Sequence, residues 1–324
     1  MRKTVERLAV TAGAFVATGV AATLLKNNAQ DRRKALRQDI EPFGTVRGFG
    51  TDVIADDGVA INVEVDPGPI PTVVFVHGWM CDIDTWHFQR LALRGKARMV
   101  FMDLRSHGRS GKALLDRCTI DDLADDLHRV INELAPSGPV VLVGHSMGGM
   151  TIQRLAGKVP TLFGERVVGT VLISTSYGGL GNSSPALRSI GPLIRSISPV
   201  LDWGREFNSY SIIKRWAVGP NASPTAIDLT NEMIMRAPTS VVVDFYPLIA
   251  QLDVGKQLDA LDRVQTTILS GSRDLMTPPS HSKRLAAAIP SAELITIRGA
   301  GHMVMFEAPQ QVSSAIEKAL EPFS

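Results

Sequence analysis

Residues Val140 to Met150 read VVLVGHSMGGM, and this stretch decides the fold class of the chain. The apolar run at its start is typical of a short strand buried on both faces, and a helix is predicted to begin at Met147. A serine, Ser146, lies on the sharp turn between them. A serine on such a turn has a strained backbone, so the positions two residues away, Gly144 and Gly148, must be glycine to avoid steric clashes. The G-x-S-x-G pattern between a strand and a helix predicts that Ser146 is a nucleophile; the alternative is a serine in an ordinary strand–helix turn.

The segments on either side of this turn alternate between strand and helix patterns. Asp57-Gly58, between two apolar alternations, predicts a hairpin near the start of the body. Strands are predicted at 71–76, 98–102, 140–143, 167–173, 266–269 and 294–297, and helices at 85–93, 119–134, 147–157 and 310–320. Strands separated by helices indicate an α/β fold: a mostly parallel, doubly wound sheet with helices on both faces.

The alternation breaks between residues 177 and 262, where prolines interrupt short apolar helical stretches. A helical insertion that crosses the carboxyl edge of the sheet has this pattern, and ligands bind at that edge in open α/β sheets. The predicted organisation is an anchor and charged tether at 1–42, a core at 43–176 and 263–324, and a helical cap at 177–262.

Two loops downstream of the serine turn carry a carboxylate and a histidine directly after predicted strands. Asp274 follows the strand at 266–269, and His302 lies in Arg298-Gly299-Ala300-Gly301-His302, after the strand at 294–297. With the G-x-S-x-G turn, these loops resemble those of the α/β-hydrolase superfamily, in its serine-esterase, monoacylglycerol-lipase-like or lysophospholipase-like branch. The likeness covers roughly residues 44–324. The family's chain order of serine, acid and histidine implies a Ser146–Asp274–His302 triad.

Two other residues compete for the triad roles. Asp103, at the end of the strand at 98–102, is the rival carboxylate, but it lies upstream and is predicted to brace the turn from Arg105 to Ser110. That turn resembles the family's D-x-R-G-x-G-x-S segment, with Ser106 where glycine is commoner. His281 is the other downstream histidine, but it begins a helix instead of following a strand.

The resemblance also implies an oxyanion hole made of two backbone N–H groups. One belongs to Met147, directly after the nucleophile. The other belongs to Trp79, in the loop His77-Gly78-Trp79 that follows the strand at 71–76. His77 is predicted to bond within this loop. The side chain of Trp79 either lines the acyl pocket or packs in the core.

Composition narrows the function class. The chain has 34 Lys and Arg against 32 Asp and Glu, a formal charge of +2, which is too balanced for a nucleic-acid footprint. Two cysteines, Cys81 and Cys118, exclude a disulfide-rich scaffold but leave one disulfide between them open. No metal site is predicted, and no cofactor is implied because a triad and an oxyanion hole suffice.

The N-terminal residues include an uncharged stretch, Leu8 to Leu25, flanked by basic residues. Eighteen apolar residues reach the short end of a membrane span, about 17–25 residues, and exceed a signal-peptide core of about 7–15. We therefore expect residues 8–25 to anchor the protein in a membrane of the cell envelope. The alternatives are a cleaved signal, with secretion of the protein, and a helix packed on its body. The sequence predicts no oligomeric state.

The function predicted is hydrolysis of carboxylic esters through an acyl-enzyme. A membrane anchor beside an apolar cap favours a lipidic ester. An amidase, peptidase, thioesterase or acyltransferase would use the same triad, so these remain alternatives. A non-catalytic binding protein of this fold is a further alternative, which the presence of all three triad residues disfavours.

Overall fold

The computed structural model of the chain describes residues 41–188 and 201–323. The chain divides into two units, Met1–Pro42 and Phe43–Ser324, and all of the secondary structure below belongs to the second. The predicted anchor at residues 8–25 lies outside the described residues, so it stays a prediction.

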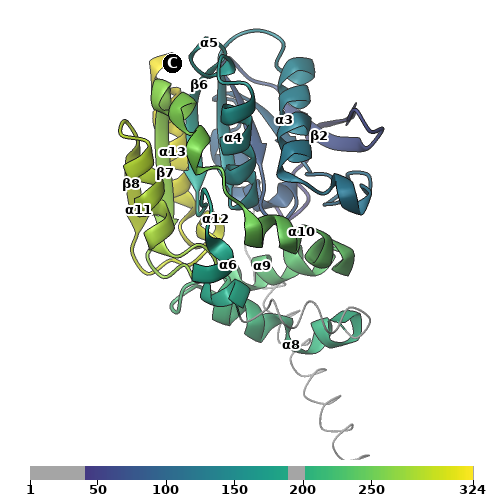
Figure 1. Cartoon of the computed structure of the whole chain (residues 1–324). Helices are drawn as coiled ribbons and strands as arrows, with labels where there is room; N and C mark the ends of the chain where they lie inside the picture. The colour runs from purple at the N-terminus through teal and green to yellow at the C-terminus, as the bar shows by residue number, and fades with distance from the viewer. Residues whose placement is uncertain (1–40, 189–200, 324) are drawn as a thin grey trace, which may run out of the picture. The chain divides into compact units, whose positions relative to one another are not determined.

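Within the described residues, eight strands form one sheet in the order β1-β2-β4-β3-β5-β6-β7-β8 (Figure 1). The strands are β1 (Phe49–Ile54), β2 (Ala60–Asp66), β3 (Thr72–Val76), β4 (Arg98–Met102), β5 (Val140–His145), β6 (Val167–Ile173), β7 (Gln265–Gly271) and β8 (Glu293–Ile297). β1 and β2 form the predicted hairpin around Asp57-Gly58, and β2 pairs antiparallel with β4. All the remaining pairs are parallel. The predicted α/β class is therefore confirmed.

Helices cover both faces of the sheet because alternate strand residues point in opposite directions. Val74 and Val76 of β3 belong to one buried cluster, whereas Val73 and Phe75 belong to the other. The first cluster includes residues of α3 (Ile120–Leu134) and α4 (Met147–Lys158), and the second includes residues of α2 (His87–Leu93) and α13 (Pro309–Leu320). The strand alternation thus builds two cores, one on each face.

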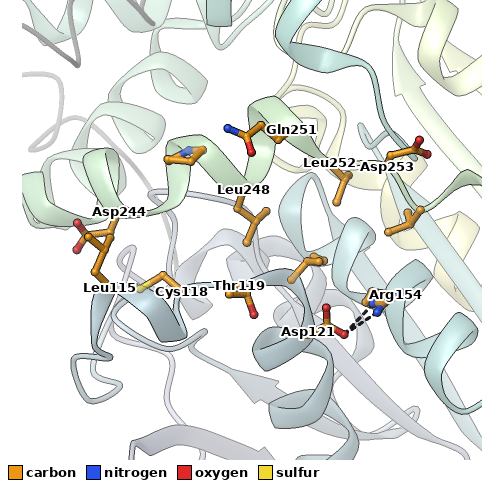
Figure 2. A pocket seen from close by; sticks show the side chains of 13 residues that line it. Leu115, Cys118, Thr119, Asp121, Arg154, Asp244, Leu248, Gln251, Leu252 and Asp253 are labelled. Atoms are coloured by element: carbon orange, nitrogen blue, oxygen red, sulfur yellow. Dashed lines mark hydrogen bonds and ion pairs between the residues drawn. The ribbon is translucent and has the colours of Figure 1, made fainter.

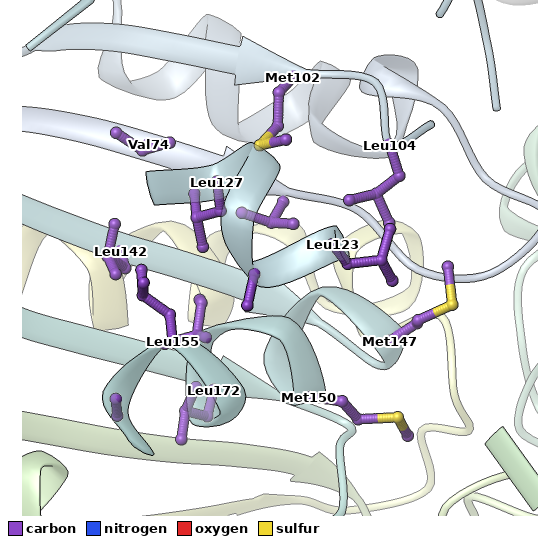
Figure 3. Packing of buried hydrophobic residues seen from close by; sticks show 14 of the residues in the cluster. Val74, Met102, Leu104, Leu123, Leu127, Leu142, Met147, Met150, Leu155 and Leu172 are labelled. Atoms are coloured by element: carbon purple, nitrogen blue, oxygen red, sulfur yellow. The ribbon is translucent and has the colours of Figure 1, made fainter. Parts of the chain in front are cut away.

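Figure 3 shows the first core at the point where it supports the serine turn. Leu155 and Met150 of α4 lie beside Leu142 of β5 and Leu172 of β6, and all four are at most 1% exposed. Burial of a side chain of this size contributes about 1.5–3 kcal/mol. α4 is therefore fixed against the strand that precedes it, and the turn between them has little freedom.

The boundaries of two predicted helices differ at their N-termini. The helix predicted from residue 85 begins as a 3₁₀ turn, Ile83–Trp86, because the Asp82 carboxylate caps it by accepting from the Asp84 N–H at 2.9 Å. α3 begins at Ile120, and its cap is Thr119, whose hydroxyl accepts from the Asp122 N–H.

Helices replace the strand–helix alternation between β6 and β7. Those described are α6 (Leu180–Ser183), α8 (Leu201–Trp216), α9 (Pro224–Arg236) and α10 (Thr239–Gln251). α10 lies over the loop after β3, since the carbonyl of Val241 accepts from the indole N–H of Trp79 at 3.0 Å. These helices fall within the range predicted as a cap, 177–262, and lie along one end of the sheet (Figure 1).

No single helix in residues 41–188 and 201–323 is both long and apolar enough to cross a membrane. α9 and α10 pass that test of length and hydropathy only as a pair, with a 98° bend between them.

Both cysteines are free and buried, so the disulfide that the sequence left open is not formed. The Cys81 thiol donates to the carbonyl of Trp79, and the Cys118 thiol donates to the carbonyl of Leu114. Burial raises the pKa of Cys81 to about 12 and that of Cys118 to about 11. Both thiols therefore stay protonated at neutral pH and act as small apolar groups.

Candidate active site

Ser146 occupies a strained turn between β5 and α4. Its φ of 51° and ψ of −113° lie in a region that residues with a side chain rarely adopt. The flanking glycines make the turn possible. A Cβ atom at Gly144 would come within 2.7 Å of the backbone of Gly148, and one at Gly148 would overlap the carbonyl of Val76. The predicted steric role of both glycines therefore agrees with the geometry.

Asp274 and His302 lie in hydrogen-bond contact, although 28 residues separate them. The imidazole Nδ1 of His302 is 2.8 Å from Oδ2 of Asp274, and both residues are buried. The loops that carry them follow β7 and β8, which are neighbours in the sheet. The adjacency of these strands explains why two distant loops meet at one edge.

The second oxygen of Asp274 fixes the carboxylate. Oδ1 accepts from the backbone N–H groups of Met276 and Thr277, each at 2.8 Å, and the Thr277 hydroxyl donates to Oδ2 at 2.8 Å. The carboxylate thus has one free direction, which His302 occupies. Thr277 is a part of this site that the sequence prediction missed. Its position three residues after the acid is typical of a side chain that closes a turn on a carboxylate.

His302 lies beside the serine turn. Its carbonyl is 3.2 Å from Nε2 of His145, and the two rings are 4.8 Å apart between centroids. Among the hydrogen bonds of the described residues, none joins the Ser146 hydroxyl to His302. Catalytic hydrogen bonds are often long before substrate binds and shorten only in the complex, so this geometry does not exclude the pair.

The loop after β3 packs against the serine. A Cβ atom at Gly78 would lie 3.1 Å from Cβ of Ser146, so glycine allows the loop to approach this closely. His77 bonds within the loop through Nδ1, which is 2.7 Å from the Gly78 carbonyl. Its Nε2 accepts from the N–H of Leu104, in the segment after β4, at 3.0 Å. Burial lowers the pKa of His77 to about 4, so this imidazole is neutral at physiological pH.

The two predicted oxyanion donors are the backbone N–H groups of Trp79 and Met147. Among the described residues, neither N–H donates a hydrogen bond. An unpaired N–H at a buried turn is costly unless a ligand or solvent satisfies it. The Trp79 side chain is 9% exposed and belongs to the first core, which favours the packing alternative for its ring.

The rival residues have structural contacts elsewhere. The Asp103 carboxylate accepts from the N–H groups of Ile83 and Arg109 and so braces the turn after β4, as predicted. Ser106 has a φ of 63°, which explains why glycine is commoner there. His281 is 1% exposed and is held between the hydroxyls of Ser176 and Ser183, each at 2.7 Å.

A cavity of about 620 Å³ lies under α10 (Figure 2). Its lining combines apolar side chains, among them Leu115, Leu248 and Leu252, with the carboxylates of Asp244 and Asp253 and the Arg154–Asp121 ion pair. A second cavity, about 160 Å³, lies beside Asp82 and Arg236. Neither lining includes any of the three predicted triad residues.

Among the described residues, no cluster of His, Cys, Asp and Glu side chains has the arrangement of a metal site.

Comparison with known proteins identifies one family, and similar solved structures agree with it. A model of the Alpha/beta hydrolase family matches residues 73–315. The structure of a thermophilic esterase from Thermogutta terrifontis, solved with malate bound, is similar at a TM-score of 0.70 and 27% identity, over 85% of this chain and 99% of that one. An esterase from Rhodococcus sp. shares the fold at a TM-score of 0.68 and 21% identity, over 85% of this chain and 99% of that one.

A curated relative differs in length. The acetyltransferase component of an acetoin-cleaving system from Pseudomonas putida is 25% identical over 245 residues, which make up 74% of this chain but only 61% of that protein. The chain therefore spans less than two thirds of this relative. The family match over residues 73–315 and the order of the eight strands together show that the chain belongs to the alpha/beta hydrolase family.

Proposed function

We propose that the chain hydrolyses carboxylic esters through an acyl-enzyme on Ser146, with His302 as the general base and Asp274 as its partner. The observation that carries this proposal is the 2.8 Å Asp274–His302 hydrogen bond, placed beside a serine with strained backbone geometry. The family and the esterase among its structural neighbours support the broader class, a carboxylic ester hydrolase.

Each residue has a distinct role in the proposed reaction. A serine hydroxyl is a weak nucleophile at neutral pH, so His302 Nε2 takes its proton during attack on the ester carbon. Asp274 accepts from Nδ1, which keeps Nε2 unprotonated and stabilises the imidazolium that forms. His302 then returns the proton to the departing alcohol. Water, activated by the same imidazole, attacks the acyl-enzyme and releases the acid.

The tetrahedral intermediate carries an oxyanion that needs fixed donors. The N–H groups of Trp79 and Met147 are the proposed donors, because both are unpaired in the described part of the chain and belong to the two turns nearest the serine. Removal of one donor from such a site typically costs about 100–1,000-fold in rate.

The apolar side chains in the cavity under α10 support an ester with an apolar portion, although none of the proposed triad residues lines this cavity. Its walls belong to the cap helix and to the core, so a hydrocarbon group placed there would be held between the two (Figure 2). An acyl or alcohol chain that extends from the serine toward this cavity is our proposal for the substrate class. An amide, thioester or acyl-transfer reaction would use the same residues and is the second class to test.

A fluorophosphonate probe tests the nucleophile directly. We expect the probe to label the wild-type protein on Ser146, and Ser146→Ala to lose both labelling and esterase activity, by about 10⁴–10⁶-fold in kcat. A panel of p-nitrophenyl esters from acetate to palmitate, with matched amides and thioesters, then distinguishes the substrate classes. Hydrolysis by Ser146→Ala at the wild-type rate would show that the serine assignment is wrong.

A further inference from the structure

The cap contacts the loop of the predicted base through a short segment, Ala217–Gly219, directly after α8. The carbonyl of Ala217 accepts from the backbone N–H of His302 at 3.0 Å and from that of Met303 at 3.1 Å. The backbone of the histidine itself is therefore bonded to the cap, through an acceptor 85 residues earlier in the chain.

A carboxylate joins the same two segments a second time. Glu307 ends the short helix α12 (Val304–Glu307), and its Oε2 accepts from the N–H of Gly219 at 2.8 Å. The N–H of Gly301, next to His302, donates to both Glu307 oxygens, at 3.0 and 3.1 Å. One side chain thus bonds the cap segment and the histidine loop at once.

Glycines allow these backbones to approach so closely. A Cβ atom at Gly219 would overlap the carbonyl of Gly299 and lie 3.0 Å from the N–H of Gly301. A Cβ atom at Gly301 would in turn overlap Gly219 and Val218. At these two glycines the backbone of the histidine loop therefore lies directly against the backbone of the cap segment.

The predicted acid has a separate contact with the cap. The Ser184 hydroxyl and the Ala186 N–H, both in the first part of the cap, donate to the carbonyl of Leu275, next to Asp274. The two catalytic loops are thus held by different parts of the cap. Of these two contacts between described residues, the one at the histidine loop includes a charged side chain between the partners.

We propose that Glu307 is a positioning residue for the proposed hydrolysis: it bonds the Gly301 and Gly219 N–H groups and so fixes the His302 loop against the Ala217–Gly219 segment of the cap. This inference rests on the proposed function. Within the described residues, the Glu307 carboxylate makes no hydrogen bond to a proposed triad side chain, although it interacts electrostatically with Asp274 and His302. The neutral Glu307→Gln variant therefore distinguishes a positioning role through the loop backbone from an effect of charge. A displacement of the base by about 1 Å can cost about 100-fold in rate, so a small movement of this loop has a large kinetic effect.

The test compares kcat, KM and the rate of fluorophosphonate labelling for the full-length protein and four variants. Glu307→Ala removes both acceptor oxygens. Glu307→Gln keeps one oxygen, which can accept from both N–H groups as Oε2 does. Gly219→Ala adds a methyl group on the cap segment, which would push this segment away from the histidine loop. Ile316→Ala, in α13, is the control, since it removes buried volume from a residue outside the site.

We expect Glu307→Ala to lower kcat by about 100-fold, with KM within about threefold of wild type. Gly219→Ala should cause a similar loss, and Glu307→Gln should recover kcat to within about tenfold. Ile316→Ala should keep kcat per folded molecule within about threefold of the wild-type value, even if its melting temperature falls as much as that of Glu307→Ala. If Glu307→Ala does not fold, Gly219→Ala and Glu307→Gln decide the question.

Two outcomes overturn the proposal in distinguishable ways. If the wild type is labelled and active while Glu307→Ala and Gly219→Ala keep kcat within threefold, the positioning role is wrong and the proposed function stands. If the wild type is neither labelled nor active on any ester, the proposed function fails and the inference fails with it.

Discussion

The serine turn and the histidine loop reach the same edge of the sheet by different physical means. The turn is held by steric fit around a strained Ser146: a side chain at Gly144 would meet the backbone of Gly148, and one at Gly148 would meet the carbonyl of Val76 in β3. The loop of His302 is held by polar contacts, with Asp274 and Ala217 far away in the sequence and with Glu307 nearby. The pattern of a nucleophile on a sharp turn can thus be recognised locally, whereas the contacts of the base depend on the assembled fold.

Among the substitutions that follow, we expect the largest loss of kcat from Asp274→Asn, which changes a polar contact of the histidine loop. The two backbone N–H groups at Oδ1 fix which end of the amide carries oxygen, so the NH₂ group faces Nδ1 of His302. The imidazole must then carry its proton on Nε2 and cannot accept one from serine. We expect kcat to fall by about 10⁴-fold, as measured with a p-nitrophenyl ester.

Asp103→Asn is the matched control for this substitution, because it alters the rival carboxylate at a buried position. It should lower the melting temperature, since Asp103 accepts from two backbone N–H groups, but leave kcat per folded molecule within about tenfold. If Asp103→Asn lost most of its kcat while Asp274→Asn kept full activity, Asp103 would be the triad acid and Asp274 the structural carboxylate.

We expect a smaller effect, on stability and on the rate of probe labelling, from Gly148→Ala, which adds a methyl group at the serine turn. The added methyl would overlap the carbonyl of Val76, which belongs to the backbone of β3 and cannot move alone. Overpacking of this kind typically costs about 1–3 kcal/mol, seen as a lower denaturation midpoint in urea, together with slower probe labelling.

Gly50→Ala in β1 provides the comparison for Gly148→Ala. Its added methyl would meet no atom within 4 Å, and alanine is favoured over glycine inside a strand by about 0.5–1 kcal/mol. We expect no loss of stability from Gly50→Ala. An equal loss from both substitutions would show that the serine turn is not sterically special.

The same contrast explains how much could be predicted from the sequence. The strand alternation, the glycines around Ser146 and the hairpin at Asp57-Gly58 are local patterns, and the sheet and the turn follow from them. The pairing of Asp274 with His302 was implied by the family resemblance, because residue spacing alone does not bring two loops together. Its geometry agrees with that implication.

The residues that the sequence did not predict are those whose contacts cross from the cap to the core. Glu307 lies five residues after His302 on an unremarkable apolar stretch, and its partner Gly219 is 88 residues away. Nothing in either local sequence indicates the other. Thr277 is the exception, since its contact with Asp274 is local: the Asp274 carboxylate also accepts from the backbone N–H two residues on, which is a common turn pattern of aspartate.

The last prediction concerns the pH dependence of stability at another contact between cap and core, where Arg236 of α9 lies 3.4 Å from Asp82. Burial, with the neighbouring carboxylates of Asp84 and Asp103, raises the pKa of Asp82 to about 7, against an ordinary value of 3.8. Between about pH 4 and 7 the folded protein therefore keeps a proton that the unfolded chain loses. The free energy of unfolding should fall as pH rises through this window, by at most about 1.4 kcal/mol per pH unit from this group.

Asp82→Asn should flatten that slope, since the amide oxygen can still cap the 3₁₀ turn by accepting from the Asp84 N–H but no longer ionises. Urea denaturation at pH 5, 6, 7 and 8 measures the slope, with Asp52→Asn, at an exposed position of β1, as the control. The serine turn is held by glycines and not by charge, so labelling of Ser146 per folded molecule should not change with Asp82→Asn. A slope equal to that of the wild type would mean that Asp82 ionises in the folded state much as it does in water. The contact of α9 with the core would then be a stabilising ion pair instead of a pH-sensitive one.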